Sequence, residues 1–174
     1  GKINIFTKHD GATGYDWATY HEKNNYENNE NNRDGTNDNS YSPSRDDKER
    51  LTKTKSAHAL NTLARGVPLS LSGDEIWHSQ NGNNNGYARP FPIKWKELTT
   101  EQKDRYLFER KLNSFRQNHP AFSNIEGASA EIMPNGKPAW EWVNTNGEPM
   151  QQGDWNFQYN RFLGYVLNGQ DKTG

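Results

Sequence analysis

Residues 3–11 are INIFTKHDG, a short apolar run followed by a His-Asp pair and a glycine. Such an order is typical of α/β barrels, which carry reactive side chains where their strands end. Gly11 allows the chain to turn sharply at little steric cost. The stretch therefore predicts a strand that presents His9 and Asp10 at its carboxyl end.

The loop that follows is dense in amides and carboxylates. Residues 24–42 are NNYENNENNRDGTNDNSYS, which is too polar to form a core. Side-chain amides both donate and accept hydrogen bonds, so this composition suits a polyhydroxylated ligand. Asn-rich segments also occur as solvated loops or disorder, and composition alone leaves both interpretations open.

Composition limits the class of protein. A chain of 174 residues predicts one domain or slightly more. Its apolar fraction of 30% lies below the roughly 45–50% of globular domains, although six Trp, eight Tyr and seven Phe partly compensate. This low apolar content predicts that the chain is not the whole of what folds.

Charge and cysteine content argue against several functions. The net charge is −1 and the basic residues are dispersed, so no basic face for nucleic acid is expected. No apolar run predicts a membrane span or a signal segment. His21, His58 and His119 lack partners at metal-ligand spacing, so we expect no metal site and no cofactor. The absence of cysteine fits a cytoplasmic protein.

The order of elements predicts a strand–helix–strand unit. Residues 46–65 have an intermittent apolar side and predict a helix. Residues 67–71 then predict a buried strand that ends at Asp74 and Glu75. A strand, a helix and a second strand imply parallel strands with a right-handed crossover.

The second half of the chain changes character. A second helix is predicted from Thr99, where Gln102 completes a capping box, to Pro120. Its apolar face is formed by Phe108, Leu112 and Phe115. Alternation and Asn-Gly turns follow: Trp140 and Trp142 share a face, Asn146-Gly147 turns, and residues 162–167 predict a strand. We place a boundary between an α/β part, 1–122, and an incomplete β domain, 123–174.

Read in order, these segments resemble the glycogen debranching and isoamylase branch of the α-amylase superfamily. The resemblance covers nearly the whole chain and depends on the ordered series of motifs, because His-Asp alone is not specific. The motifs are FTKHDG (6–11), ENNRDGTNDN (30–39), GVP (66–68), SGDE (72–75), QNGNNNGY (80–87), Arg116 with His119-Pro120, and GDW (153–155).

The resemblance implies the last two strand–helix units of a (β/α)₈ barrel, followed by the start of an antiparallel β-sandwich domain. Residues 3–10 would be the seventh barrel strand, 67–72 the eighth, and 124–174 the opening of the C-terminal domain. The family hydrolyses α-1,6 branch linkages in glycogen-like or starch-like α-glucans with retention. It uses three carboxylates, of which only the third matches this chain, at Asp10. The nucleophile and the acid/base would lie upstream in the rest of the parent enzyme, so the isolated segment is expected to be inactive.

The resemblance also assigns roles. Asp10 would bind hydroxyls of the distorted sugar more tightly in the transition state than in the ground state. His9 would donate a hydrogen bond to a hydroxyl. Arg33, Asp34 and Asn84 are further candidate substrate-binding residues. For Arg33 and Asp34 the alternative is a pair that braces the loop, and Asn84 could instead satisfy turn backbone.

Two features depart from the family pattern. Lys8 stands where a small residue usually precedes the His-Asp pair, and residues 88–91, ARPF, replace a Cys and acidic residues. Asp74 and Glu75 follow a strand as well, but the family assigns them no acid/base role, so we expect them to anchor loops.

Two other functions remain open. A non-catalytic carbohydrate-binding module could use the Asn-rich loops and the aromatic pair Trp140 and Trp142. Another superfamily activity, an α-1,4 hydrolase or a transferase, would use the same Asp10. The Asn-rich block after the His-Asp pair favours the debranching branch, by resemblance only.

Overall fold

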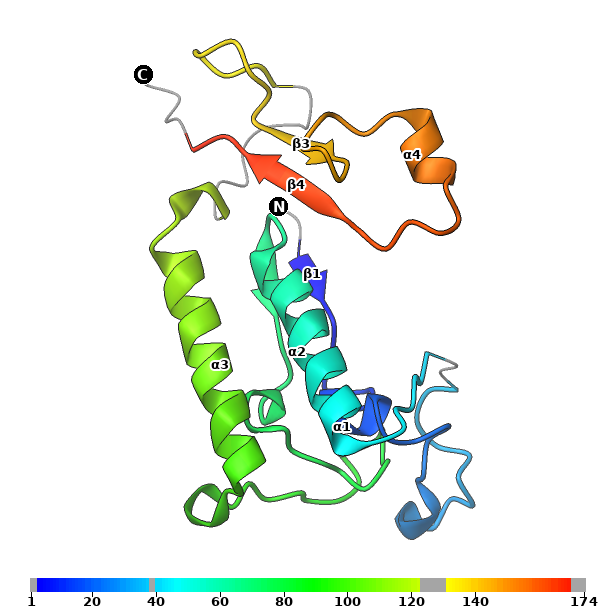
Figure 1. The fold of residues 1–174 in the computed structure, drawn as a ribbon. Coiled ribbons are helices and arrows are strands. Elements are labelled where there is room, and N and C mark those ends of the chain that lie inside the picture. Colours follow the sequence, from blue (N-terminus) through cyan, green and yellow to red (C-terminus); the bar gives the residue numbers. More distant parts are fainter. Residues whose placement is uncertain (1–2, 38–39, 123–130, 170–174) are drawn as a thin grey trace.

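The computed structural model describes residues 3–37, 40–122 and 131–169 (Figure 1). Its first sheet pairs β1 (Ile3–Ile5) with β2 (Val67–Leu69) in parallel, with Ile3 opposite Val67 and Ile5 opposite Leu69. The predicted parallel pairing is confirmed. Both strands are shorter than predicted, and residues 9–10 form a turn beyond the end of β1.

Helix α2 (Asp47–Leu63) connects the two parallel strands and packs against them. The Asp46 side chain caps its first turn by accepting a hydrogen bond from the Glu49 amide at 2.8 Å. Near its end, the Asn61 side chain donates to the Leu69 carbonyl at 3.0 Å and fixes the helix to β2. The helix predicted over 46–65 is confirmed.

Helix α3 (Thr100–Gln117) lies alongside α2 (Figure 1). It begins with the predicted capping box, in which Thr99 and Gln102 bond to each other's backbone. Leu112 is 8% exposed, but Phe115 is 46% exposed and stacks on His119. Only part of the predicted apolar face therefore enters the core.

The C-terminal part forms a second sheet. Strands β3 (Trp140–Val143) and β4 (Gly164–Leu167) pair antiparallel, and α4 (Gln152–Asn156) lies on the connection between them. The rings of Trp140 and Trp142 meet edge to face at 5.6 Å, and a turn at Gly147 follows β3, both as predicted. The Tyr165 hydroxyl donates to the Leu63 carbonyl and so connects this sheet to the end of α2. The predicted boundary falls at residues 123–130, which lie outside the described residues.

One face of the first sheet stays open in the described part of the chain. Ile3, Ile5, Val67 and Leu69 are between 41% and 60% exposed. Successive side chains of a strand point to opposite faces, so these four share the face away from Asn4 and Pro68. The prediction that residues 67–71 form a buried strand is therefore wrong, because α2 packs on one face only.

The remaining helical elements are short. They are α1 (Gly14–Trp17) and the 3₁₀ turns at Tyr26–Asn28, Asp74–Ile76, Trp95–Glu97 and Pro120–Phe122. Within residues 3–37, 40–122 and 131–169, no helix has the length and apolar character needed to cross a bilayer. The same residues contain no group of three or more His, Asp or Glu arranged to hold a metal ion.

Candidate functional site

The candidate site begins where β1 ends. Thr7 is 4% exposed, and its hydroxyl accepts a hydrogen bond from the Leu71 amide at 3.3 Å, which links the carboxyl ends of both strands. His9 and Asp10 follow in an exposed turn. A hollow of about 230 Å³ beside this turn is lined by Lys8, Gly11 and Trp17, among others.

Asp10 is paired with its neighbour Lys8. The Lys8 ammonium lies 3.1 Å from the Asp10 carboxylate, and both side chains are 52% exposed. This hydrogen bond is the main cause that lowers the pKa of Asp10 below its ordinary value of 3.8. Lys8, which departs from the family pattern, therefore stabilises the ionised form of the candidate catalytic carboxylate.

Asp74 anchors the loop that carries Asp10. The Gly14 amide donates to the Asp74 carboxylate at 2.8 Å, and Asp74 is 2% exposed. Beside it, the Glu75 carboxylate accepts from the Gly73 amide at 2.7 Å. Both contacts agree with the predicted loop-anchoring roles of Asp74 and Glu75.

A buried charged cluster, formed by His58, Asp74, Arg105 and Glu109, lies behind this loop. Nε2 of His58 is 3.6 Å from Asp74 and Nδ1 is 3.3 Å from Glu109. Arg105, which is 0% exposed, contacts the same Glu109 oxygen. The sequence reasoning missed this cluster and considered His58 only as a metal ligand. The available signal was the helical spacing of Thr54, His58 and Asn61, a polar stripe on α2 that is buried.

The Asn-rich loop is fixed by a reciprocal pair of asparagines. Asn25 is 0% exposed, and its amide nitrogen donates to the Asn84 side chain at 2.8 Å. In return, the Asn84 backbone amide donates to Asn25 Oδ1 at 3.0 Å. Asn84 is 1% exposed and also donates to the Thr36 carbonyl at 2.8 Å. These contacts agree with the alternative in which Asn84 satisfies loop backbone, and its role in substrate binding stays a prediction.

Asp34 braces the same loops from the side. Its carboxylate accepts from Asn28 at 2.7 Å and from Asn85 at 2.9 Å. The bond from Asn28 is the main cause that lowers the pKa of Asp34. Arg33 turns away and pairs with Glu30, its Nε donating to the Glu30 carbonyl at 3.1 Å. The alternative of an Arg33–Asp34 pair is therefore wrong, because Arg33 pairs with Glu30 while Asp34 accepts from Asn28 and Asn85 through one oxygen.

The predicted site residues thus separate into two groups. His9 and Asp10 share the exposed turn at the end of β1, and Arg33 is exposed on the Asn-rich loop. Asp34 and Asn84 form the hydrogen-bonded support beneath that loop. This arrangement offers an ionised carboxylate, an imidazole and a guanidinium to solvent, supported by fixed loops.

A parallel β–α–β unit whose strands lead into acidic residues is typical of α/β enzymes, both barrels and open sheets. Comparison with known proteins defines the family. No family model matches the chain. The chain is 32% identical over 98% of its length to the glycogen operon protein GlgX homolog of Mycobacterium tuberculosis. It is 34% identical over 88% of its length to the glycogen debranching enzyme of an Enterobacter species, and 33% identical over 88% to that of Salmonella typhi.

The chain belongs to this glycogen debranching family, the isoamylase-type branch of the α-amylase superfamily. It spans about a quarter of the length of these relatives, between 24% and 26%. The resemblance noted in the ordered sequence motifs is therefore confirmed.

Proposed function

We propose that this chain is a segment of a retaining glycoside hydrolase that cleaves α-1,6 branch linkages in glycogen-like or starch-like α-glucans. The observation that carries this proposal is the position of His9 and Asp10 in the turn that follows β1, in a chain related over most of its length to proteins named glycogen debranching enzyme. A debranching enzyme of stored glycogen acts in the cytoplasm, which is the location that we propose.

The open face of the first sheet supports a barrel. In a closed (β/α)₈ barrel, alternate side chains of parallel strands fill the interior, and branched apolar residues dominate there. Ile3, Ile5, Val67 and Leu69 have this character and share one face, opposite the face that α2 covers. We propose that residues 1–122 contribute the last two strand–helix units of such a barrel, and that 123–174 begin an antiparallel β domain.

Asp10 would act as the third carboxylate of the reaction. Retaining glycosidases place a nucleophile and an acid/base roughly 5 Å apart, on either side of the scissile bond. A further ionised carboxylate that accepts hydrogen bonds from hydroxyls of the distorted ring lowers the barrier, provided that it binds the transition state more tightly than the substrate. The Lys8 ammonium stabilises this ionised form of Asp10. The nucleophile and acid/base are proposed to come from the rest of the parent enzyme.

The fixed loops would form part of the substrate-binding rim. His9 and Arg33 are exposed donors, and sugar hydroxyls are their natural acceptors. Asn25, Asn84 and Asp34 hold the loop that carries Arg33, so this part of the rim does not need to be ordered by substrate. Pre-organisation of this kind lowers the entropic cost of binding.

The test is the Asp10→Asn variant of the longer protein that carries this sequence. We expect the rate of debranching of a branched glucan to fall by at least about 10²-fold, because the variant loses a charge that acts in the transition state. The exposed Asp104→Asn variant on α3 is the control and should keep its rate. A near-normal rate for Asp10→Asn would remove this residue from the catalytic set. The 174-residue chain alone should show no turnover, and measurable turnover would overturn the segment interpretation.

A carbohydrate-binding module is the second candidate, favoured by the exposed aromatic side chains of the β3–β4 part. In that case Trp140→Ala would weaken glucan binding, whereas Asp10→Asn would have no effect on any activity of the longer protein. The debranching assay described above therefore separates the two functions.

A further inference from the structure

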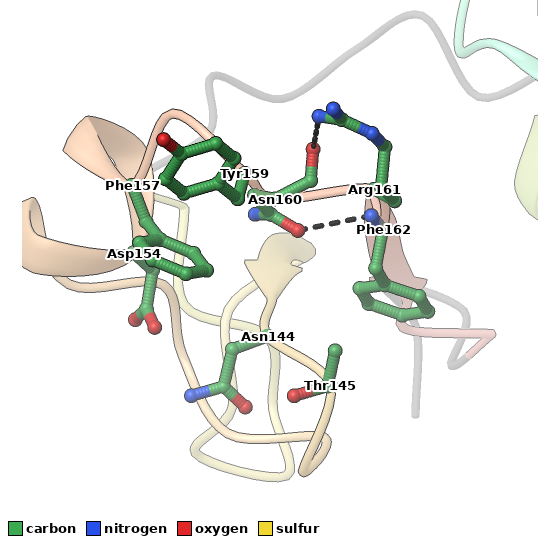
Figure 2. Close-up of a pocket in the computed structure, with 8 residues that line it drawn as sticks. All are labelled: Asn144, Thr145, Asp154, Phe157, Tyr159, Asn160, Arg161 and Phe162. Carbon is green, nitrogen blue, oxygen red and sulfur yellow. Dashed lines mark hydrogen bonds between the residues drawn. The ribbon is translucent and has the colours of Figure 1, made fainter.

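We propose that the β3–β4 part of this chain contains a glucan-contact site, formed between the turn after β3 and the segment that leads from α4 to β4. Figure 2 shows the residues around a hollow of about 350 Å³ at this position. Three of them are aromatic and the other five are polar or charged. Ligand pockets in proteins have volumes of roughly 300–1,000 Å³, so the hollow is large enough for a small ligand or part of a larger one.

The three aromatic residues around the hollow are exposed to solvent and are not part of the core. Phe157 is 60% exposed, Tyr159 65% and Phe162 43%. The rings of Phe157 and Tyr159 meet edge to face at 5.9 Å, so each ring still has a face that a ligand can cover. Covering an apolar ring that is exposed to water lowers the free energy, and rigid aromatic residues are enriched at binding surfaces for this reason.

The segment that carries these rings is held in place at both ends. The Trp155 ring meets Trp142 of β3 edge to face at 5.9 Å, which fixes the segment near α4. At the other end, a Cβ at Gly164 would lie 2.6 Å from the Phe162 ring, so glycine leaves the space that this ring occupies. The aromatic residues are therefore presented on a supported loop.

Polar side chains around the hollow are oriented by local hydrogen bonds. Asp154 accepts from the Gln151 amide at 2.8 Å, Asn160 from the Phe162 amide at 2.9 Å, and Asn144 from the Asn146 amide at 2.9 Å. Each bond uses one oxygen of the side chain. Within the described residues, the second polar atom of each carboxyl or amide group is left for a ligand.

This combination of chemistry favours a sugar. Glucose rings have apolar faces bordered by hydroxyl groups, so they match exposed aromatic rings beside fixed amides and a carboxylate. Asp154 and Arg161 bring one charge of each sign to the hollow, so its lining has no net charge that would favour an ionic ligand over a neutral sugar. The choice of an α-glucan depends on the proposed function, because a branched polymer reaches several sites on one enzyme. A second contact raises the effective concentration of the polymer near the first.

The test uses the longer protein with Asp10→Asn, so that the polymer is not degraded, and measures retardation in native gels that contain glycogen. Tyr159→Ala should raise the apparent Kd for glycogen about three- to tenfold, the effect expected for one aromatic contact. Tyr159→Phe keeps the ring and should keep most of the affinity. Tyr106→Ala, which removes a tyrosine that is 37% exposed on α3, should leave retardation unchanged.

The outcomes separate this site from the proposed function. Equal retardation of the folded Tyr159→Ala variant and its parent would overturn the site, even if debranching by the protein with native Asp10 is normal. If that protein shows no debranching but its retention on glycogen still depends on Tyr159, the proposed function fails and the site is supported. A change in oligomeric state with unchanged glycogen affinity would show that the rings pack against protein, which also overturns the site.

Discussion

The Gly14 backbone amide donates a 2.8 Å hydrogen bond to the Asp74 carboxylate, and this bond joins the loop after β1 to the loop after β2. The second Asp74 oxygen lies 3.6 Å from His58, which in turn contacts Glu109 of α3. The loop that follows the candidate catalytic Asp10 is therefore connected to both long helices through buried polar side chains.

Asp74→Ala should destabilise the fold by about 1–3 kcal/mol, because it leaves the buried Gly14 amide without its acceptor and removes one of the two carboxylates beside His58. Urea denaturation monitored by tryptophan fluorescence measures this change. Asp104→Asn is the control, since the Asp104–Lys55 pair lies at the surface and such pairs contribute at most about 1 kcal/mol. Equal effects of the two variants would contradict the anchoring role of Asp74.

Gly35→Ala should disrupt the Asn25–Asn84 pair. Gly35 has a φ of +70°, and a Cβ there would lie 2.2 Å from Asn84 Oδ1. Gly147→Ala separates backbone strain from the clash with Asn84. Gly147 has a φ of +79° but no atom within 4 Å of its Cβ position. We expect a loss of about 1 kcal/mol at Gly147 from backbone strain alone. The loss at Gly35 should exceed it by a further ~1–3 kcal/mol from broken buried hydrogen bonds. Thermal unfolding compares them, and similar losses would show that the contact with Asn84 is unimportant.

Arg116→Lys should destabilise the junction between α3 and β2 by about 2–3 kcal/mol. The Arg116 guanidinium donates to four backbone carbonyls, those of Thr62, Ala64, Gly66 and Phe122. A lysine ammonium carries three donors on one nitrogen, so it cannot satisfy the four separate acceptors that the wider guanidinium reaches. Arg110→Lys, on the exposed side of α3, is the control for chemical denaturation. A loss at Arg116 no larger than at Arg110 would refute this account.

The Asp10 carboxyl should titrate below its ordinary pKa of 3.8, because Lys8 stabilises the ionised form. A lowered folded-state pKa contributes stability that is present above pH 3.8 and is lost as the pH falls through the folded value. Lys8→Met should bring the pKa of Asp10 back toward 3.8, as NMR titration of the side-chain carbon would show. Lys48→Met, on α2, should leave the titration unchanged, and a Lys8→Met variant that also leaves it unchanged would exclude the pairing.

Local patterns predicted the helices more accurately than the strands. Thr99 and Gln102 placed the start of α3 because a capping box depends on residues three positions apart. The strands were predicted too long, since an apolar run does not show where pairing stops. The predicted burial of Val67 and Leu69 was wrong, because the burial of a strand depends on what covers the sheet rather than on the residues of the strand.

By itself, the sequence determined the order of elements, the parallel pairing of β1 with β2, and the position of His9 and Asp10 in the segment that follows the first strand. These features follow from hydrophobic periodicity, capping residues and turn residues, which act over a few neighbouring positions. Only the tertiary structure decided that Asn25 pairs with Asn84, that Asp34 contacts Asn85 and not Arg33, and that His58 lies between two carboxylates. The asparagine and aspartate partners are about 50 to 60 residues apart, and they meet because parallel strands bring their following loops to the same edge of the sheet. His58 and Glu109 meet because α2 packs against α3.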